Sequence, residues 1–223
     1  MKIKFSLLLL AVSLLSLIPL QSRADTIALT FSNASGSGIA KDTELGWSFS
    51  LSTNVLVTQL GSFDGPNGAF GNPNGDGLQS NQLVTIWTST GTMVTSATVL
   101  AGGGTLDSDF RFVSIAPTLL TAGNYVISNY YDPNNLDRNT EFNATVNTAP
   151  GVTYGDARGP SSGGHAFPTF VFSGNGIWGP NFQFVAAPPN GNGVPEAGSS
   201  WILLALSLGG TFGLRVISKR RLA

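Results

Sequence analysis

The amino-acid sequence predicts a mainly β protein, built as a single jelly-roll-like β-sandwich with an N-terminal signal peptide and one C-terminal transmembrane helix. Three observations lead to this fold class. From residue 25 onward the chain is rich in Gly, Ser, Thr, Asn, Val and aromatic residues. Its apolar runs are short and are separated by turn residues. No 3.6-residue periodicity is present before residue 201.

The first half of the domain contains the clearest strand patterns. The segment 44–51 alternates Leu45, Trp47, Phe49 and Leu51 on one face, as expected for a half-buried strand. We expect Trp47, Phe49 and Trp87 to be buried. The strands expected in this half are 26–31, 44–51, 55–63, 82–88 and 92–100, the last two joined by a hairpin turn at 89–91.

The second half has weaker patterns of the same kind. The strands expected here are 110–115, 124–131, 141–146, 167–172 and 181–186. About ten short strands with turns between them favour a sandwich over residues 25–186. The sequence contains no cysteine, so the fold depends on a packed core and not on disulfides.

The N-terminus has the organisation of a secretory signal peptide over residues 1–24. Lys2 and Lys4 form a positive region, and an apolar stretch follows over 5–20. Small residues precede the Ala24–Asp25 bond, where we expect a signal peptidase to cut. The alternative is an N-terminal anchor that is not cleaved.

The C-terminus combines three features after a Pro/Gly-rich linker at 187–193. A short motif, Val194, Pro195 and Glu196, comes first. An apolar run follows at about 200–217, long enough for a short membrane-spanning helix. A basic cluster ends the chain and should stay cytoplasmic by the positive-inside rule. Its members are Lys219, Arg220 and Arg221.

This arrangement over 194–223 resembles the PEP-CTERM family of bacterial sorting signals and the related VPDSG-type signals. Those signals carry a Pro-Glu-Pro-like motif, one hydrophobic helix and a terminal Arg-rich cluster; here the third motif position is Ala197. The resemblance implies recognition by an exosortase, a membrane-embedded cysteine peptidase, and cleavage near the motif. The alternative is a plain C-terminal anchor that is never cut.

The exported domain also carries a resemblance of its own, in the segments ELGWSF at 44–49, LGSFD at 60–64, VTIW at 84–87, FRFV at 110–113 and LTAGNY at 120–125. Over 44–131 it resembles a β-sandwich module of the DUF4082-like group, often found ahead of PEP-CTERM signals. The resemblance implies a fold and an exported location, and no biochemical activity.

Charge narrows the possible partners. From Asp25 to Glu196 the chain has 12 acidic residues against four basic ones, Lys41, Arg111, Arg138 and Arg158, for a net charge of −8. Such a surface repels nucleic acid, so we expect no nucleic-acid partner. The only histidine is His165, which excludes a multi-histidine zinc site within one chain.

One loop has the oxygen side chains of a calcium site. Asn72, Asn74 and Asp76 alternate ahead of Gly77, and Asp64 could add a fourth ligand. The twelfth position from Asn72 is Leu83, where an EF-hand has glutamate, so an EF-hand is excluded. Ca²⁺ is therefore an optional cofactor, and the alternative is an Asn/Gly turn that needs no ion.

Two further residues, Trp178 and Ser161, lie in sequence contexts that allow a functional interpretation. Trp178 lies between glycines in an expected loop, where it could stack on a sugar ring or simply pack over the end of the sandwich. Ser161 belongs to a G-x-S-x-G string near His165. Its flanks are a polar Gly/Ser loop and not the strand and helix of a nucleophile elbow. No catalytic residue is assigned.

The sequence therefore predicts a non-enzymatic exported protein. It would first be anchored in the cytoplasmic membrane with its domain outside, then processed by an exosortase-type peptidase. Its destination would be the cell envelope, the extracellular space or an exopolysaccharide matrix. The alternative from another class is a carbohydrate-binding module on the cell surface, with Ca²⁺ as an optional aid. A hydrolase is disfavoured because no constellation of catalytic side chains is visible.

Overall fold

The computed structural model describes residues 24–33, 37–65, 75–138, 140–142, 144–160, 163–172 and 176–188. All regular secondary structure in these ranges is β, which confirms the mainly β prediction; they include no helix able to cross a membrane. The strands are β1 (Thr26–Ile27), β2 (Leu29–Ser32), β3 (Ser37–Gly38), β4 (Thr43–Leu51), β5 (Val55–Phe63), β6 (Gln82–Thr88), β7 (Met93–Val99), β8 (Thr105–Asp107), β9 (Phe110–Leu120), β10 (Gly123–Tyr131), β11 (Thr140–Phe142), β12 (Thr145–Thr148), β13 (Val152–Gly159), β14 (Phe170–Phe172), β15 (Gly176–Trp178) and β16 (Pro180–Ala186).

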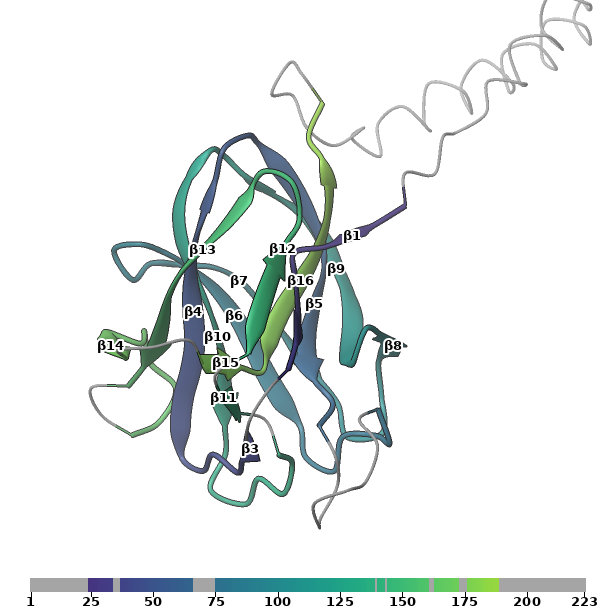
Figure 1. Cartoon of the computed structure of the whole chain (residues 1–223), viewed down its shortest axis with the longest axis vertical. Helices are drawn as coiled ribbons and strands as arrows, with labels where there is room; N and C mark the ends of the chain where they lie inside the picture. Colours follow the sequence, from purple (N-terminus) through teal and green to yellow (C-terminus); the bar gives the residue numbers. More distant parts are fainter. Residues whose placement is uncertain are drawn as a thin grey trace, which may run out of the picture.

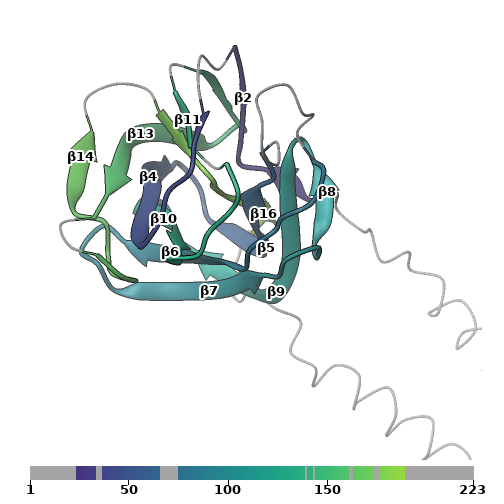
Figure 2. The same ribbon diagram turned by 90° about the horizontal axis from the view of Figure 1, so that it is seen from below.

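Two antiparallel sheets form the body of the domain (Figure 1). The six-stranded sheet has the order β14-β13-β4-β10-β6-β7, and the five-stranded sheet has the order β1-β16-β5-β9-β8. Seen from below, the sheets lie on opposite sides of a common interior, and β7 of one runs beside β9 of the other (Figure 2). The arrangement is that of a β-sandwich. Two small sheets, β15-β11-β3 and β12-β2, complete it.

The interior is filled by alternate residues of the facing strands. Trp47 and Phe49 point inward from β4 and are 0% and 2% exposed, as predicted. The indole of Trp47 stacks on the ring of Phe182 from β16 at 6.2 Å, and its Nε1 donates to the Pro180 carbonyl at 2.8 Å. Burying one large apolar side chain contributes about 1.5–3 kcal/mol, so such contacts join the two sheets strongly.

The described chain enters and leaves the domain at the same place. Strand β1 pairs antiparallel with β16, with Thr26 opposite Phe184 and Ile27 opposite Gln183. Because the two strands run in opposite directions, Asp25 lies close to the end of β16. Figure 1 shows β1 and the outgoing end of β16 at the same end of the sandwich.

Several strand predictions are confirmed and several need correction. The expected strands 55–63 and 82–88 coincide with β5 and β6. Strand β13, in contrast, was not predicted, because its sequence VTYGDARG has a glycine and an aspartate where apolar residues would alternate. It forms because it can pair with β4 along the edge that β10 does not occupy. Gly155 and Asp156 are accommodated at a bulge between Tyr154 and Ala157.

Four predicted strands are divided or differ from the observed ones by more than one residue at an end. The segment 26–31 changes sheets at Ala28, so that β1 pairs with β16 and β2 with β12. The segment 141–146 is likewise divided between β11 and β12. Strand β9 extends past Pro117, which lies where the register with β5 shifts, a site that tolerates proline. Residues 167–169 are not in a strand, since Pro168 has no N–H for a ladder.

Candidate functional site

The structure places only part of the predicted site residues. The sorting motif Val194, Pro195 and Glu196, the basic cluster Lys219, Arg220 and Arg221, and the loop residues Asn72 and Asn74 lie outside the described residues, as does Ser161. The predicted cleavage bond Ala24–Asp25 is described and exposed, immediately before β1. The Asp25 carboxylate accepts a hydrogen bond from Gln59 Nε2 at 2.8 Å.

Asp64 of the predicted calcium site has protein donors around its carboxylate. Arg111 Nε donates to Asp64 Oδ2 at 2.6 Å, and the backbone N–H of Gly77 lies 3.1 Å from both oxygens. Burial raises the pKa of Asp64, while Arg111 acts in the opposite direction. Within the described ranges no three acidic or histidine side chains gather in a metal-binding group. Calcium binding by the loop stays a prediction.

A second buried carboxylate fixes the next part of the same loop. Asp137 is 1% exposed and accepts the backbone N–H groups of Gln79 and Ser80 at 2.7 and 2.9 Å. It also accepts Gln82 Nε2 at 2.9 Å. Residues 75–80 are therefore held to the sandwich by two aspartates, Asp64 and Asp137.

Trp178 lies on strand β15 and not in a loop as predicted. Its backbone pairs with Thr140 of β11. The two flanking glycines suggested a loop, but the neighbouring strand β11 supplies the pairing that makes this segment extended. The indole of Trp178 is outside the described side chains.

The first candidate site lies on the outer face of the six-stranded sheet and centres on Glu44. This side chain of β4 is fully buried. Ser128 of β10 donates to Glu44 Oε1 at 2.5 Å, and His165 Nδ1 lies 2.8 Å from Glu44 Oε2. Trp87 of β6 donates from Nε1 to the Ser128 hydroxyl at 2.6 Å. Four polar groups from separate parts of the chain thus form one connected chain of hydrogen bonds.

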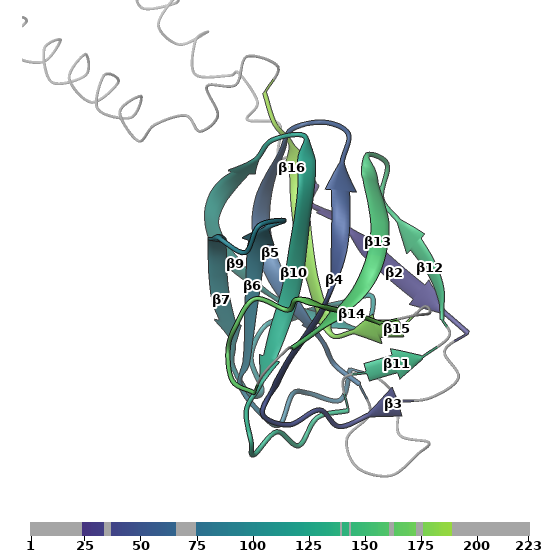
Figure 3. The ribbon, with the colours of Figure 1, turned by 90° about the vertical axis from the view of Figure 1, so that its left-hand side faces the viewer.

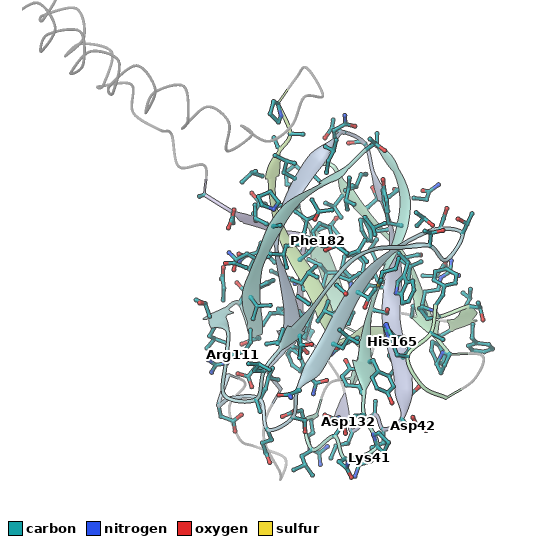
Figure 4. The ribbon with its side chains drawn as sticks, turned by 180° about the vertical axis from the view of Figure 1, so that it is seen from behind. Lys41, Asp42, Arg111, Asp132, His165 and Phe182 are labelled. Carbon is teal, nitrogen blue, oxygen red and sulfur yellow. The ribbon has the colours of Figure 1, made fainter. Side chains whose placement is uncertain are left out.

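Residues 163–169 cover these groups. Figure 3 shows the chain after β13 passing in front of the six-stranded sheet before it returns to β14. The rings of His165 and Phe167 lie 5.4 and 5.9 Å from the Trp87 ring. Trp87 is buried, as predicted, but by this covering segment and not between the two sheets. Figure 4 shows His165 on this side of the molecule, and Arg111 on the other side.

The Glu44 cluster has the residue types of a hydrolase but not their order. A nucleophilic serine needs a base that accepts its proton, with the carboxylate behind the base. Here the Ser128 hydroxyl and His165 both bond to the Glu44 carboxylate, so serine and histidine do not bond to each other. Burial raises the pKa of Glu44, and the bonds from Ser128 and His165 oppose that rise. The arrangement attaches the covering segment to the sheet.

The second candidate site is an open groove on the same outer face, beyond the covering segment. It encloses about 430 Å³. Its polar lining comes from adjacent strands β4, β10 and β13. The side chains that matter most are Ser48, Ser50, Asn124, Thr153, Asp156 and Arg158. The groove exists because the outward residues of β4 in this region, Ser48 and Ser50, are small while their neighbours are longer.

Sequence reasoning did not single out Glu44, Asp156 or Arg158. Glu44 occupies a polar position of an alternating strand, where an acidic residue is normally interpreted as an ordinary surface residue. Asp156 and Arg158 belong to β13, a strand that the sequence pattern does not predict. Comparisons with protein-family models, curated proteins and solved structures gave no match.

Proposed function

We propose that this is a non-enzymatic exported protein of the cell envelope or extracellular matrix, processed through its C-terminal signal. The domain, a jelly-roll-like sandwich, crosses the cytoplasmic membrane behind the signal peptide at 1–24. The apolar helix at about 200–217 then holds it at the membrane with the domain outside. An exosortase-type peptidase recognises Val194, Pro195 and Glu196 and releases the domain toward the envelope or an exopolysaccharide.

The observation that carries this proposal is the pairing of β1 with β16. Thr26 lies opposite Phe184, so the segment before the domain and the segment after it leave from one end of the sandwich. This geometry suits a domain held by both termini during export, because both neighbouring segments must reach the same membrane surface. In the sequence, residues 187–193 supply a Pro/Gly-rich spacer between the domain and the motif.

Processing of the tail is tested with a single substitution. In a host with an exosortase, the wild-type chain should lose the segment after the motif and leave the membrane fraction. Glu196→Ala should keep its full length and stay with the membrane, because Glu196 is outside the helix and adds nothing to insertion. Asn190→Ala, in the linker, is the matched control and should be processed normally.

Two results would overturn the sorting proposal. One is a wild-type protein that keeps its tail in such a host, and the other is equal processing of the Glu196 variant. Replacing Lys219, Arg220 and Arg221 by serine should also disturb processing, since these charges set the orientation of the helix.

A second function is favoured by one specific observation, the groove on the six-stranded sheet. Its hydroxyl, amide, carboxylate and guanidinium groups suit a carbohydrate, and an envelope or matrix protein meets carbohydrate at its destination. We propose carbohydrate binding as an activity of the exported domain. It is independent of how the tail is processed.

A further inference from the structure

We infer that the groove formed by β4, β10 and β13 is a binding site for a neutral sugar unit of an oligosaccharide. The inference rests on the second proposed function and gives it a location and a ligand class. It replaces Trp178, the residue expected from the sequence to contact a sugar, with a different set of side chains. Four features of the groove support it.

The groove is shaped by small residues at its floor. Ser48 and Ser50 point outward from β4, and Gly155 of β13 lies so close that a Cβ there would be 2.4 Å from Ser48 Oγ. Val126 of β10 also belongs to the lining, but it is only 2% exposed. The volume of about 430 Å³ is within the range of small-ligand sites.

The bulge in β13 places an acidic side chain at the rim. The register between β13 and β4 shifts between Tyr154 and Ala157. Ser48 Oγ holds the bulge by accepting the Asp156 N–H at 2.7 Å. The Asp156 side chain is 53% exposed, so its carboxylate is available to a ligand. Bulges commonly redirect a side chain in this way at binding sites.

Arg158 supplies a donor that the protein does not use. Its Nη2 is 3.4 Å from Asp156 Oδ2, a long contact, and its Nε is buried without an acceptor. The Arg158 side chain is 22% exposed, so a ligand oxygen in the groove can offer its guanidinium a shorter, charge-assisted hydrogen bond than Asp156 does. The Arg158 guanidinium can therefore donate hydrogen bonds to an acceptor that enters the groove.

The combination of groups selects the class of ligand. A sugar offers adjacent hydroxyls that both donate and accept, matching a carboxylate, a guanidinium and several hydroxyls side by side. Asp156 and the net charge of −8 between Asp25 and Glu196 disfavour an anionic sugar. A flat aromatic ligand is disfavoured as well. The rings of Tyr125 and Tyr154 stack on the core residues Phe49 and Trp47. They therefore do not form two facing ring surfaces between which a flat ligand could stack.

The test uses the full chain in a detergent without a sugar head group, with isothermal titration and saturation-transfer NMR. The probes are maltose, cellobiose and lactose, with digalacturonic acid as the anionic counterpart. At least one neutral disaccharide should bind. Arg158→Gln and Asp156→Asn should each weaken that binding roughly 10-fold or more, the effect expected for loss of a charge-assisted hydrogen bond.

Two further variants separate the site from the fold. Ser50→Trp fills the groove from its floor and should abolish binding while the circular dichroism spectrum is kept. Lys41→Gln removes a cation outside the groove and should bind like wild type. If the groove variants unfold, Ser50→Thr, which narrows the groove by one methyl group, still has to weaken binding.

Each failure points to one proposal. If a neutral disaccharide binds and the groove variants leave its affinity unchanged, the groove is not the binding site. The second proposed function would then hold, with the sugar bound elsewhere on the domain. If no probe binds to wild type, or digalacturonic acid binds more tightly than the neutral sugars, the neutral-sugar inference is wrong. If neutral polysaccharides such as dextran and cellulose also fail to retain the chain, the second proposed function fails with it. Processing of the tail is unaffected by all of these results.

Discussion

The outer face of the six-stranded sheet has two halves that differ in how they treat polar residues. In the covered half, Glu44, Ser128 and Trp87 are joined to one another and to His165 by hydrogen bonds. In the open half, Asp156 is half exposed and the Arg158 Nε has no acceptor. Both halves are built on β4 and β10, and in each half those strands present polar side chains.

The difference shows that a polar side chain on a strand has no fixed role. Where residues 163–169 lie over the sheet, Glu44, Ser128 and Trp87 are buried and form hydrogen bonds with one another, as most buried polar groups do. Where the sheet is open, the same kinds of groups stay available to a ligand. Stability should therefore depend on the covered half, and binding on the open half.

The largest effect is expected from Glu44→Ala. This change removes the acceptor of Ser128 and the partner of His165 and leaves a hole beneath the covering segment. We expect a loss of about 3 kcal/mol in the free energy of unfolding, the range found when one partner of a buried pair is removed. Urea unfolding at pH 7 measures it. Glu44→Gln keeps the shape and one acceptor, and should lose clearly less; equal losses would contradict this account.

Ser128→Ala should have the next largest effect. The Ser128 hydroxyl accepts from Trp87 Nε1 and donates to Glu44, so its removal leaves both without that partner. We expect a loss of about 1–2 kcal/mol in unfolding free energy. Ser96→Ala, at an exposed position of the neighbouring strand β7, is the control and should be close to neutral. If the Ser128 variant is as stable as this control, the hydrogen bonds of Ser128 do not help to hold residues 163–169 on the sheet.

The pH dependence of stability tests the covered half in another way. Burial raises the pKa of Glu44 above its usual value of 4.5, so the folded state holds this proton more tightly than the unfolded state. The stabilisation is complete below pH 4.5 and is lost as pH rises through the folded pKa. The difference in unfolding free energy between wild type and Glu44→Gln should therefore shift against wild type as pH rises. A difference that is constant from pH 4.5 to 8 would contradict this.

The smallest effects on stability are expected in the open half. Ser50→Ala and Thr153→Ala remove hydroxyls that line the groove. Each should change the unfolding free energy by less than about 0.5 kcal/mol, as is usual for surface positions. Chemical denaturation of the two variants is the measurement. A loss as large as that of Ser128→Ala would show that the open half also supports the fold.

Much of the fold could be predicted from alternation. The alternation around Trp47 and Phe49 and the apolar residues of β5 at 55–57, 60 and 63 indicate both a strand and its buried side. Strand β13 could not be predicted, since Gly155 and Asp156 interrupt its pattern and only the edge of β4 makes it a strand. The local sequence predicts a loop at Trp178 for a related reason, because it contains no sign of the pairing partner on β11.

Almost nothing of the candidate sites could be predicted from the sequence. Glu44 and His165 are 121 residues apart, and nothing near either one indicates the other. The sequence indicates Asp64 as a potential ligand for a metal cation, but in the fold its carboxylate pairs with Arg111, 47 residues further along. Local motifs indicate which groups are available, whereas long-range pairing decides which groups meet.

By itself, the sequence determined the β class of the domain, its dependence on a packed core without disulfides, and its net negative charge. These properties follow from composition and from a two-residue period that each strand carries locally. Only the tertiary structure decided that β1 lies against β16, that His165 covers Glu44, and that Ser48, Asp156 and Arg158 share a groove. The physical reason is that these contacts join segments far apart in the chain. They form only after sheet pairing has brought their strands together, and no local pattern encodes that pairing.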